Sequence, residues 1–205
     1  LWRRTVGTGN RQVGFGDAEG NMASPSPVTD GEHVWILMGT GDLACFDRYG
    51  KPAWKTNIQK TYGRFDIQFG MSSTPLLADG RLYIQVIHGP MRGAAEPAYV
   101  VALDKKTGKT RWVRDRNVKS DWDATLRARG IDPRDVKKKK PGDNKKSYAT
   151  AKLIELDGRR QLIAPAAEAT ISYDPVTGKE LWRVHHFGGF NVACRPLFDH
   201  GLVYL

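Results

Sequence analysis

Short segments that alternate apolar and polar residues recur along the whole chain, and tight-turn sequences separate them. The segments at 33–37 and 43–46, for example, flank a Gly-Thr-Gly turn. Alternation with a period of two indicates antiparallel strands with one buried face, and no long stretch keeps a helical period. The segments fall into groups of four strands, which predicts an all-β protein of four-stranded antiparallel meanders. The full groups span 24–56, 72–114 and 148–184, and partial groups lie at 1–6 and 193–205.

A repeated motif joins the third and fourth strands of each group. It reads Ala-Leu-Asp-Lys-Lys-Thr-Gly-Lys-Thr-Arg-Trp at 102–112, recurs at 172–182, and is one residue shorter at 45–54. We expect its Asp to accept hydrogen bonds from turn amides and its Gly to adopt a positive φ. The Trp offers a large apolar surface that we expect to pack against a neighbouring copy. The residues assigned to this docking role are Asp47, Gly50, Trp54, Asp104, Gly108, Trp112, Asp174, Gly178 and Trp182.

Four-stranded units repeated in this way are typical of the blades of a β-propeller. Inserted loops lengthen the later units beyond the about 40–50 residues of a typical repeat. A propeller closes with about 4–8 blades. Three full groups with partial blades on either side therefore predict one incomplete propeller over 1–205, in a chain that we expect to be cut at both ends.

The motif resembles the Ala-x-Asp-x-x-Thr-Gly-Lys-x-x-Trp repeat of the pyrroloquinoline quinone (PQQ)-like propeller family. The match is complete at 102–112, carries Ser in place of Ala at Ser172, and is shortened at 45–54. The resemblance covers nearly all of the chain outside 116–146. It implies that the motif tryptophans dock adjacent blades, and that the protein is periplasmic or otherwise exported. The family includes PQQ-dependent alcohol dehydrogenases and the propeller lipoprotein of the outer-membrane β-barrel assembly machine, so the fold alone does not specify an activity.

All the long connections of the predicted blades fall at one end, because connections in a meander alternate between its two ends. These connections are 57–70, 88–97, 116–146 and 185–192, and we call this end the loop-rich face. Long loops on a rigid scaffold usually carry binding, so we expect a protein or polymer partner there. Aromatic residues that only hold the first loop against the blades are the alternative. The candidate binding residues are Tyr62, Arg64, Phe65, Asp66, Phe69, His88, Arg92, Trp122 and His186.

The positive charge of the chain is concentrated in one connection. The net charge is +10, and segment 116–146 supplies 11 Lys and Arg against 5 Asp. Ser120 or Asp121 is expected to cap a short helix that continues through Ala128, and the Asp-Pro pair at 132–133 predicts a second helix start. The Lys-rich part of this insertion is suited to a membrane surface or an acidic partner, with a solvated loop as the alternative. No nucleic-acid-binding fold is recognised, and no nucleic acid is expected.

Cysteine and histidine spacing indicates no metal site. Cys45 and Cys194 form neither a metal-ligand pattern nor a disulfide framework, and we expect both to be small buried apolar residues. The five histidines include no His-x-x-x-His pair. His185 and His186 would point to opposite faces of a strand.

The family resemblance leaves two functions open. PQQ-dependent dehydrogenases hold the cofactor between a Trp and a disulfide of adjacent cysteines, beside Ca²⁺ bound by acidic and amide ligands, and an Asp acts as base. This chain has no adjacent Cys pair and no acidic group that matches. We therefore assign no catalytic or cofactor-binding residue, predict no cofactor, and expect a monomeric, non-catalytic envelope scaffold. A PQQ- and Ca²⁺-dependent alcohol or sugar dehydrogenase is the alternative.

Overall fold

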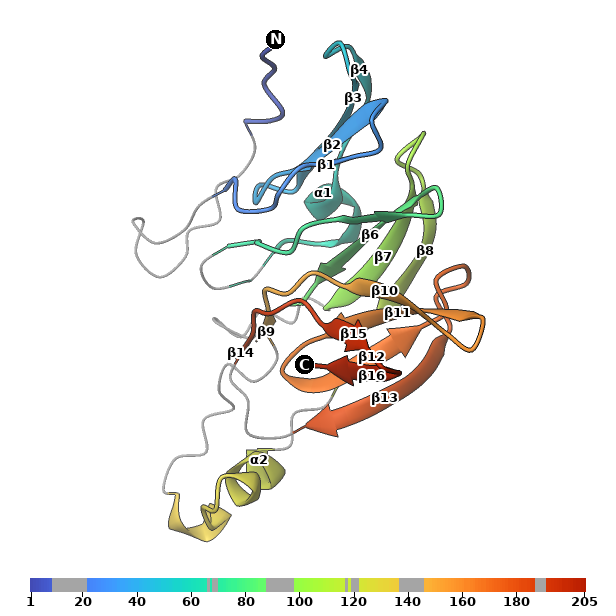
Figure 1. Ribbon diagram of the computed structural model, residues 1–205. Helices are drawn as coiled ribbons and strands as arrows, with labels where there is room; N and C mark the ends of the chain where they lie inside the picture. Colours follow the sequence, from blue (N-terminus) through green and yellow to red (C-terminus); the bar gives the residue numbers. More distant parts are fainter. Residues whose placement is uncertain are drawn as a thin grey trace.

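The strands form successive antiparallel sheets that lie one after another through the molecule (Figure 1). The computed structural model describes residues 1–8, 22–65, 67, 70–87, 98–116, 118, 122–136, 146–186 and 191–205. Three sheets have four strands in sequential order, and a two-stranded hairpin follows them. The predicted fold class, an incomplete propeller of four-stranded antiparallel blades, is confirmed. Within the described residues, no helix is long and apolar enough to cross a membrane.

Each blade is a simple meander. The first blade contains β1 (Val28–Thr29), β2 (His33–Leu37), β3 (Asp42–Asp47) and β4 (Pro52–Asn57). The second contains β5 (Leu76–Ala78), β6 (Arg81–Val86), β7 (Tyr99–Asp104) and β8 (Thr110–Asp115). The third contains β10 (Lys152–Leu156), β11 (Arg159–Pro165), β12 (Glu168–Tyr173) and β13 (Glu180–His186). The hairpin of β15 (Leu197–Asp199) and β16 (Leu202–Tyr204) begins a fourth blade.

The strand register explains why the repeated motif begins with a small residue. Ala102 of β7 lies directly opposite Trp112 of β8, and the register shifts immediately after this pair. Cys45 faces Trp54 and Ser172 faces Trp182 in the same way. Opposite residues of an antiparallel pair project on the same side of the sheet. A small side chain therefore leaves room for the indole on that side.

The turns between the first and second strands of the second and third blades follow from their Asp-Gly sequences. Asp79 and Gly80 have φ angles of 51° and 73°, and Asp157 and Gly158 repeat them at 50° and 70°. Two successive positive φ angles make the type I′ turn that suits the twist of a hairpin. The β15–β16 hairpin turns in the same way at 200–201, a turn that the sequence pattern did not single out.

The core lies between the blades, because alternate residues of each central strand face opposite neighbours. In β6, Leu82 and Ile84 pack toward the first blade, whereas Tyr83 packs toward the third. In β7, Val101 packs toward the first blade and Val100 packs toward the third. Each blade therefore depends on both neighbours to bury its two faces.

The helices lie in the connections between blades. The helix predicted in the charged insertion is confirmed as α2 (Trp122–Ala128). The second predicted helix start corresponds to the 3₁₀ turn η1 (Pro133–Asp135), which Asp132 caps. Helix α1 (Ile58–Tyr62) was not predicted. The parallel pair of β9 (Lys146–Ser147) and β14 (Asn191–Val192) was not predicted either.

One prediction about the cysteines is wrong. Cys45 is buried on β3, as expected, but Cys194 is exposed. Cys194 lies between β14 and β15 beside the exposed residues Ala193 and Arg195. Only the two-stranded hairpin continues from there, so no complete sheet among the described residues covers the thiol.

Candidate functional site

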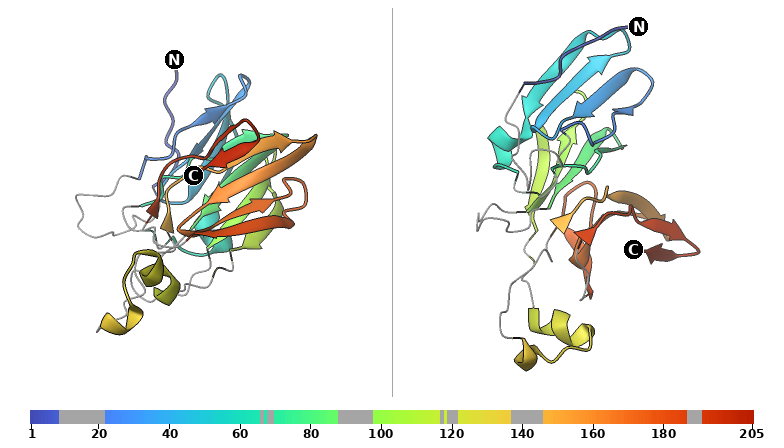
Figure 2. Two further views of the ribbon diagram at one scale, coloured as in Figure 1. Left: turned by 60° about the horizontal axis from the view of Figure 1, so that its bottom comes forward. Right: turned by 90° about the vertical axis from the view of Figure 1, so that its left-hand side faces the viewer.

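The two ends of the blades differ in what they carry (Figure 1). The hairpin turns project at one end, on the right of Figure 1. Helices α1 and α2 and the β9–β14 pair lie at the other end, which is the loop-rich face. The further views show α2 standing away from the sheets (Figure 2).

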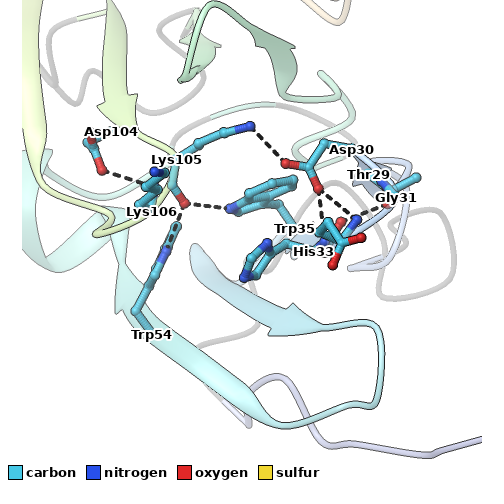
Figure 3. A network of polar contacts seen from close by, with 10 residues as sticks. Thr29, Asp30, Gly31, His33, Trp35, Trp54, Asp104, Lys105 and Lys106 are labelled. Carbon is cyan, nitrogen blue, oxygen red and sulfur yellow. Dashed lines mark hydrogen bonds and ion pairs between the residues drawn. The ribbon is translucent and has the colours of Figure 1, made fainter.

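At the hairpin end, the tryptophan of one blade contacts the turn of the next. The Trp54 Nε1–H donates to the Lys105 carbonyl at 3.0 Å, and the Trp35 Nε1–H donates to the same oxygen at 2.9 Å (Figure 3). One blade further on, Trp112 and the Tyr83 hydroxyl share the Pro175 carbonyl, each at 3.1 Å. In both cases the acceptor directly follows the motif Asp. The shared acceptor was not apparent from the sequence.

The motif glycines allow this contact because they sit beneath the indoles. A Cβ added to Gly108 would lie 2.7 Å from Trp54 Cε3, and one added to Gly178 would lie 2.6 Å from Trp112 Cδ2. Both glycines also have a positive φ, near 70°. Only glycine combines this backbone conformation with so close an approach.

Trp2, which lies before the first copy of the motif, and Trp182, the last motif tryptophan, differ in their contacts. Trp2 precedes the first blade, lies over Gly50, and donates to the Arg48 carbonyl at 3.0 Å. Trp182 instead donates to Gln161 Oε1 of its own blade at 2.7 Å. No following docking turn lies against Trp182 in the part of the chain that the structure describes.

Carboxylates of the turns complete the hairpin end. Asp30 Oδ2 pairs with Lys105 Nζ of the next blade at 2.8 Å (Figure 3). Asp79 of the second blade likewise pairs with Arg160 of the third. Partial burial alone would raise the pKa of Asp30, but hydrogen bonds from Lys105 and from turn amides lower it to about 2. These polar groups are thus occupied in joining one blade to the next.

The first connection at the loop-rich face, 57–70, contains residues that anchor it to the blades and one exposed cation. The Tyr62 hydroxyl shares a hydrogen bond with Thr110, and its ring lies 5.4 Å from that of Tyr99. Phe65 is buried, with its amide bonded to Gln59 Oε1. These contacts favour the reading in which the aromatic residues hold the loop. Arg64 is exposed beside them and is available to a partner.

The structure describes two of the other predicted binding residues, Trp122 and His186. Asp66, Phe69, His88 and Arg92 lie outside the described residues. Trp122 is the first residue of α2. His186 ends β13, where its Nε2 lies 3.1 Å from Thr170 Oγ1, and burial lowers its pKa.

A buried polar junction between the second and third blades was missed at the sequence level. The Gln85 amide nitrogen donates to Ser147 Oγ, to the Ala149 carbonyl and to the Pro165 carbonyl. The Ser147 hydroxyl in turn donates to the Pro165 carbonyl at 2.7 Å. Gln85 is the one polar residue within the apolar run of β6, and that interruption was the available signal.

Arg116, which directly follows β8, extends this junction. Its Nη2 donates to the carbonyls of Ala167 and Ala169 in the third blade. Gln85 and Arg116 thus both contact the buried segment that joins β11 to β12.

The described side chains do not fit the PQQ and Ca²⁺ arrangement of the dehydrogenases. Cys45 and Cys194 are both free, one buried and one exposed, so they supply no disulfide. Within the described residues, no three His, Cys, Asp or Glu side chains gather as metal ligands. No catalytic step is derived for such a group.

Comparison with protein families gives one match. A profile described as the β-propeller domain of glucose, ethanol and alcohol dehydrogenases, named for PQQ, matches residues 51–169, more than half of the chain. No curated protein sequence matches the chain.

Solved structures share the fold at low sequence identity. A quinohemoprotein alcohol dehydrogenase from Comamonas testosteroni is 15% identical with a TM-score of 0.51, covering 84% of this chain and 30% of that one. The PilY1 C-terminal domain from Pseudomonas aeruginosa is 16% identical with a TM-score of 0.50, covering 83% and 35%. BamB from Moraxella catarrhalis is 16% identical with a TM-score of 0.49, covering 86% and 44%. The chain thus spans less than half the length of each.

Proposed function

The chain belongs to the family of β-propeller domains of glucose, ethanol and alcohol dehydrogenases, and from this premise we propose that it is a non-catalytic scaffold. Its loop-rich face binds a protein or polymer partner in the bacterial cell envelope. The envelope location follows from the family resemblance alone.

The difference between the two ends of the blades carries this proposal. At the hairpin end, indoles, carbonyls and carboxylates are used in contacts between blades, as at Trp54, Lys105 and Asp30. At the loop-rich face, the Arg64 side chain is exposed and α2 stands away from the sheets (Figure 2). Rigid blades that present projecting loops at one end suit recognition.

The insertion provides the direct test. The full-length protein and a variant with residues 119–145 replaced by a short Gly-Ser linker, which keeps the buried Val118, are used to recover partners from an envelope extract. The scaffold role predicts that a partner recovered with the intact protein is lost with the variant, while both proteins unfold at the same urea concentration. Identical recovery by both would contradict a binding role for the insertion.

The family description also supports a second function, a PQQ-dependent dehydrogenase. The poor fit of Cys45 and Cys194 to a cofactor disulfide argues against it. Full-length protein mixed with PQQ, Ca²⁺, a dye acceptor and a panel of alcohols and sugars should give no turnover if the scaffold role is right. Dye reduction that requires both PQQ and substrate would replace the scaffold role with the enzyme.

A further inference from the structure

The residue four positions after the docking tryptophan differs between the three blades, and a comparison of these residues shows where the first blade lacks a cation. This residue is Ile58 in the first blade, Arg116 in the second and His186 in the third. Ile58 is 1% exposed and belongs to the apolar core between the first two blades. The first blade thus carries an apolar residue, the first of helix α1, at this offset from the docking tryptophan, and no cation.

Arg116 is a buried cation with unused hydrogen-bonding capacity. Its residue is 8% exposed, and its Nη2 is bonded only to the carbonyls of Ala167 and Ala169. Its Nη1 is buried and has no hydrogen-bond partner, and no ion pair joins it to a carboxylate in the described structure. Burial lowers the pKa of the guanidinium to about 10, so it remains charged at neutral pH.

Such an arrangement is unfavourable for the protein alone. Burying a charge costs several kcal/mol unless a counter-charge and hydrogen bonds compensate. Two neutral carbonyls satisfy only part of the guanidinium, and the charges that act on it include the carboxylates of Glu168 and Glu180 and the guanidinium of Arg183. A buried donor without a partner in a native structure calls for a specific explanation, and a bound group is one.

The composition of the connection that Arg116 begins indicates the nature of that group. In segment 116–146, 11 Lys and Arg outnumber 5 Asp. A connection with this net charge attracts acidic partners. A carboxylate is planar and can accept two parallel hydrogen bonds from a guanidinium, which a single carbonyl cannot.

We propose that Arg116 binds a carboxylate of the scaffold's partner, an acidic side chain that enters between the second and third blades at the loop-rich face. This inference rests on the proposed scaffold function and specifies the chemistry of its partner.

The test replaces Arg116 with the residue that the first blade uses. Arg116→Ile is compared with wild type for binding a fluorescein-labelled deca-glutamate peptide, measured by fluorescence anisotropy at low salt. The proposal predicts a loss of affinity of about 30-fold or more, because the removed cation pairs with a desolvated carboxylate. The same variant should unfold at a urea midpoint equal to or above that of wild type.

Arg114→Ile is the matched control. Arg114 lies on β8, two residues before Arg116, and donates to the Thr177 carbonyl at 2.8 Å, but it is exposed. Its replacement removes the same formal charge and should weaken peptide binding by only about twofold. Equal losses in the two variants would show that only net charge matters and would overturn the proposal.

Three other outcomes would also overturn it. Unchanged peptide binding by Arg116→Ile would exclude the contact. Weaker binding together with a lower urea midpoint would mark Arg116 as a structural donor to Ala167 and Ala169. Thermal stabilisation of wild type by succinate that is lost in Arg116→Ile, without peptide binding, would assign the site to a free organic acid.

The proposed function is tested separately, because the linker variant keeps Arg116. If a partner is lost with the linker variant but retained by Arg116→Ile, the scaffold role stands and the carboxylate contact fails.

Discussion

The contact that recurs most regularly is an indole lying over a glycine. Trp112 covers Gly178 and donates to the Pro175 carbonyl, while the residue itself is only 6% exposed. The same three features, ring, glycine and carbonyl, meet at Trp54 and at Trp2. A single side chain therefore supplies both apolar packing and a directional hydrogen bond between blades.

Removing this side chain should loosen the joint between the second and third blades. Trp112→Ala is expected to lower the free energy of unfolding by about 3–5 kcal/mol, because a large buried ring is lost. Trp112→Phe keeps part of the ring but loses the bond to Pro175, and should cost less. Trp182→Ala is the matched control, since Trp182 is half-buried and bonded within its own blade. Urea melts in which Trp112→Ala and wild type coincide would contradict the docking role.

The glycine beneath the ring should be equally sensitive. Gly108→Ala forces a Cβ onto the Trp54 ring and also strains a positive φ, whereas Gly31 has a positive φ with open space around it. We expect Gly31→Ala to cost about 1–2 kcal/mol and Gly108→Ala to cost about 1–3 kcal/mol more. Denaturant melts of both variants measure the difference.

A second-site variant checks the cause. In the Trp54→Ala background the clash is absent, so Gly108→Ala should cost no more than Gly31→Ala. An unchanged cost in that background would assign the effect to the backbone alone.

Asp104, the carboxylate of the docking turn at 104–108, should make the free energy of unfolding depend on pH. Arg111 and the turn donors of Thr107 and Lys106 lower the pKa of Asp104 from 3.8 to about 2. A carboxylate whose pKa is lower in the folded state stabilises the fold above its ordinary pKa and loses that effect as the pH falls. Wild type should therefore lose stability between about pH 4 and pH 2, and Asp104→Asn should lose less. Urea midpoints across this range provide the measurement, and parallel curves would contradict the assignment.

At the scale of elements, the side chain of Asn57 fixes the start of helix α1. Asn57 Oδ1 accepts from the Lys60 amide at 3.1 Å, while its Nδ2 donates to the Thr40 carbonyl at 3.2 Å and to Asp42 Oδ1 at 3.0 Å. The residue thus caps the helix and ties it to the preceding turn.

Replacement of Asn57 separates these two roles. Asn57→Ser keeps a capping oxygen but loses the Nδ2 bonds, and Asn57→Ala loses both. The Ala variant should be less stable than the Ser variant by about 1 kcal/mol, which is the typical value of an N-cap. Equal urea midpoints would show that capping contributes nothing here.

Elements with a strong local signal were predictable, and short ones were not. Helix α2 follows a capping signal and spans seven residues. Helix α1 has only five residues, and β9 and β14 have two each. Such short pieces carry too little periodicity to be recognised. They form because tertiary neighbours fix them, as Ser147 is fixed between the second and third blades.

At the scale of the whole molecule, repetition made the fold predictable and left the function open. Three copies of one motif set the strand order, so the incomplete propeller follows from the sequence. Contacts that depend on two blades at once could not be predicted, because no single blade contains them. Examples are the shared carbonyl of Lys105 and the buried guanidinium of Arg116. The exposure of Cys194 was also missed, because no complete sheet among the described residues covers its thiol.

The central claim is that a partner binds at the loop-rich face and not at the hairpin end, and a paired charge reversal tests it most directly. Arg64 and Arg48 are both exposed and lie at opposite ends of the first blade. The affinity of a partner recovered from envelope extract is measured for Arg64→Glu and Arg48→Glu in the full-length protein. The account predicts that Arg64→Glu weakens binding by about tenfold or more, whereas Arg48→Glu changes it little. Weaker binding only in Arg48→Glu would contradict it.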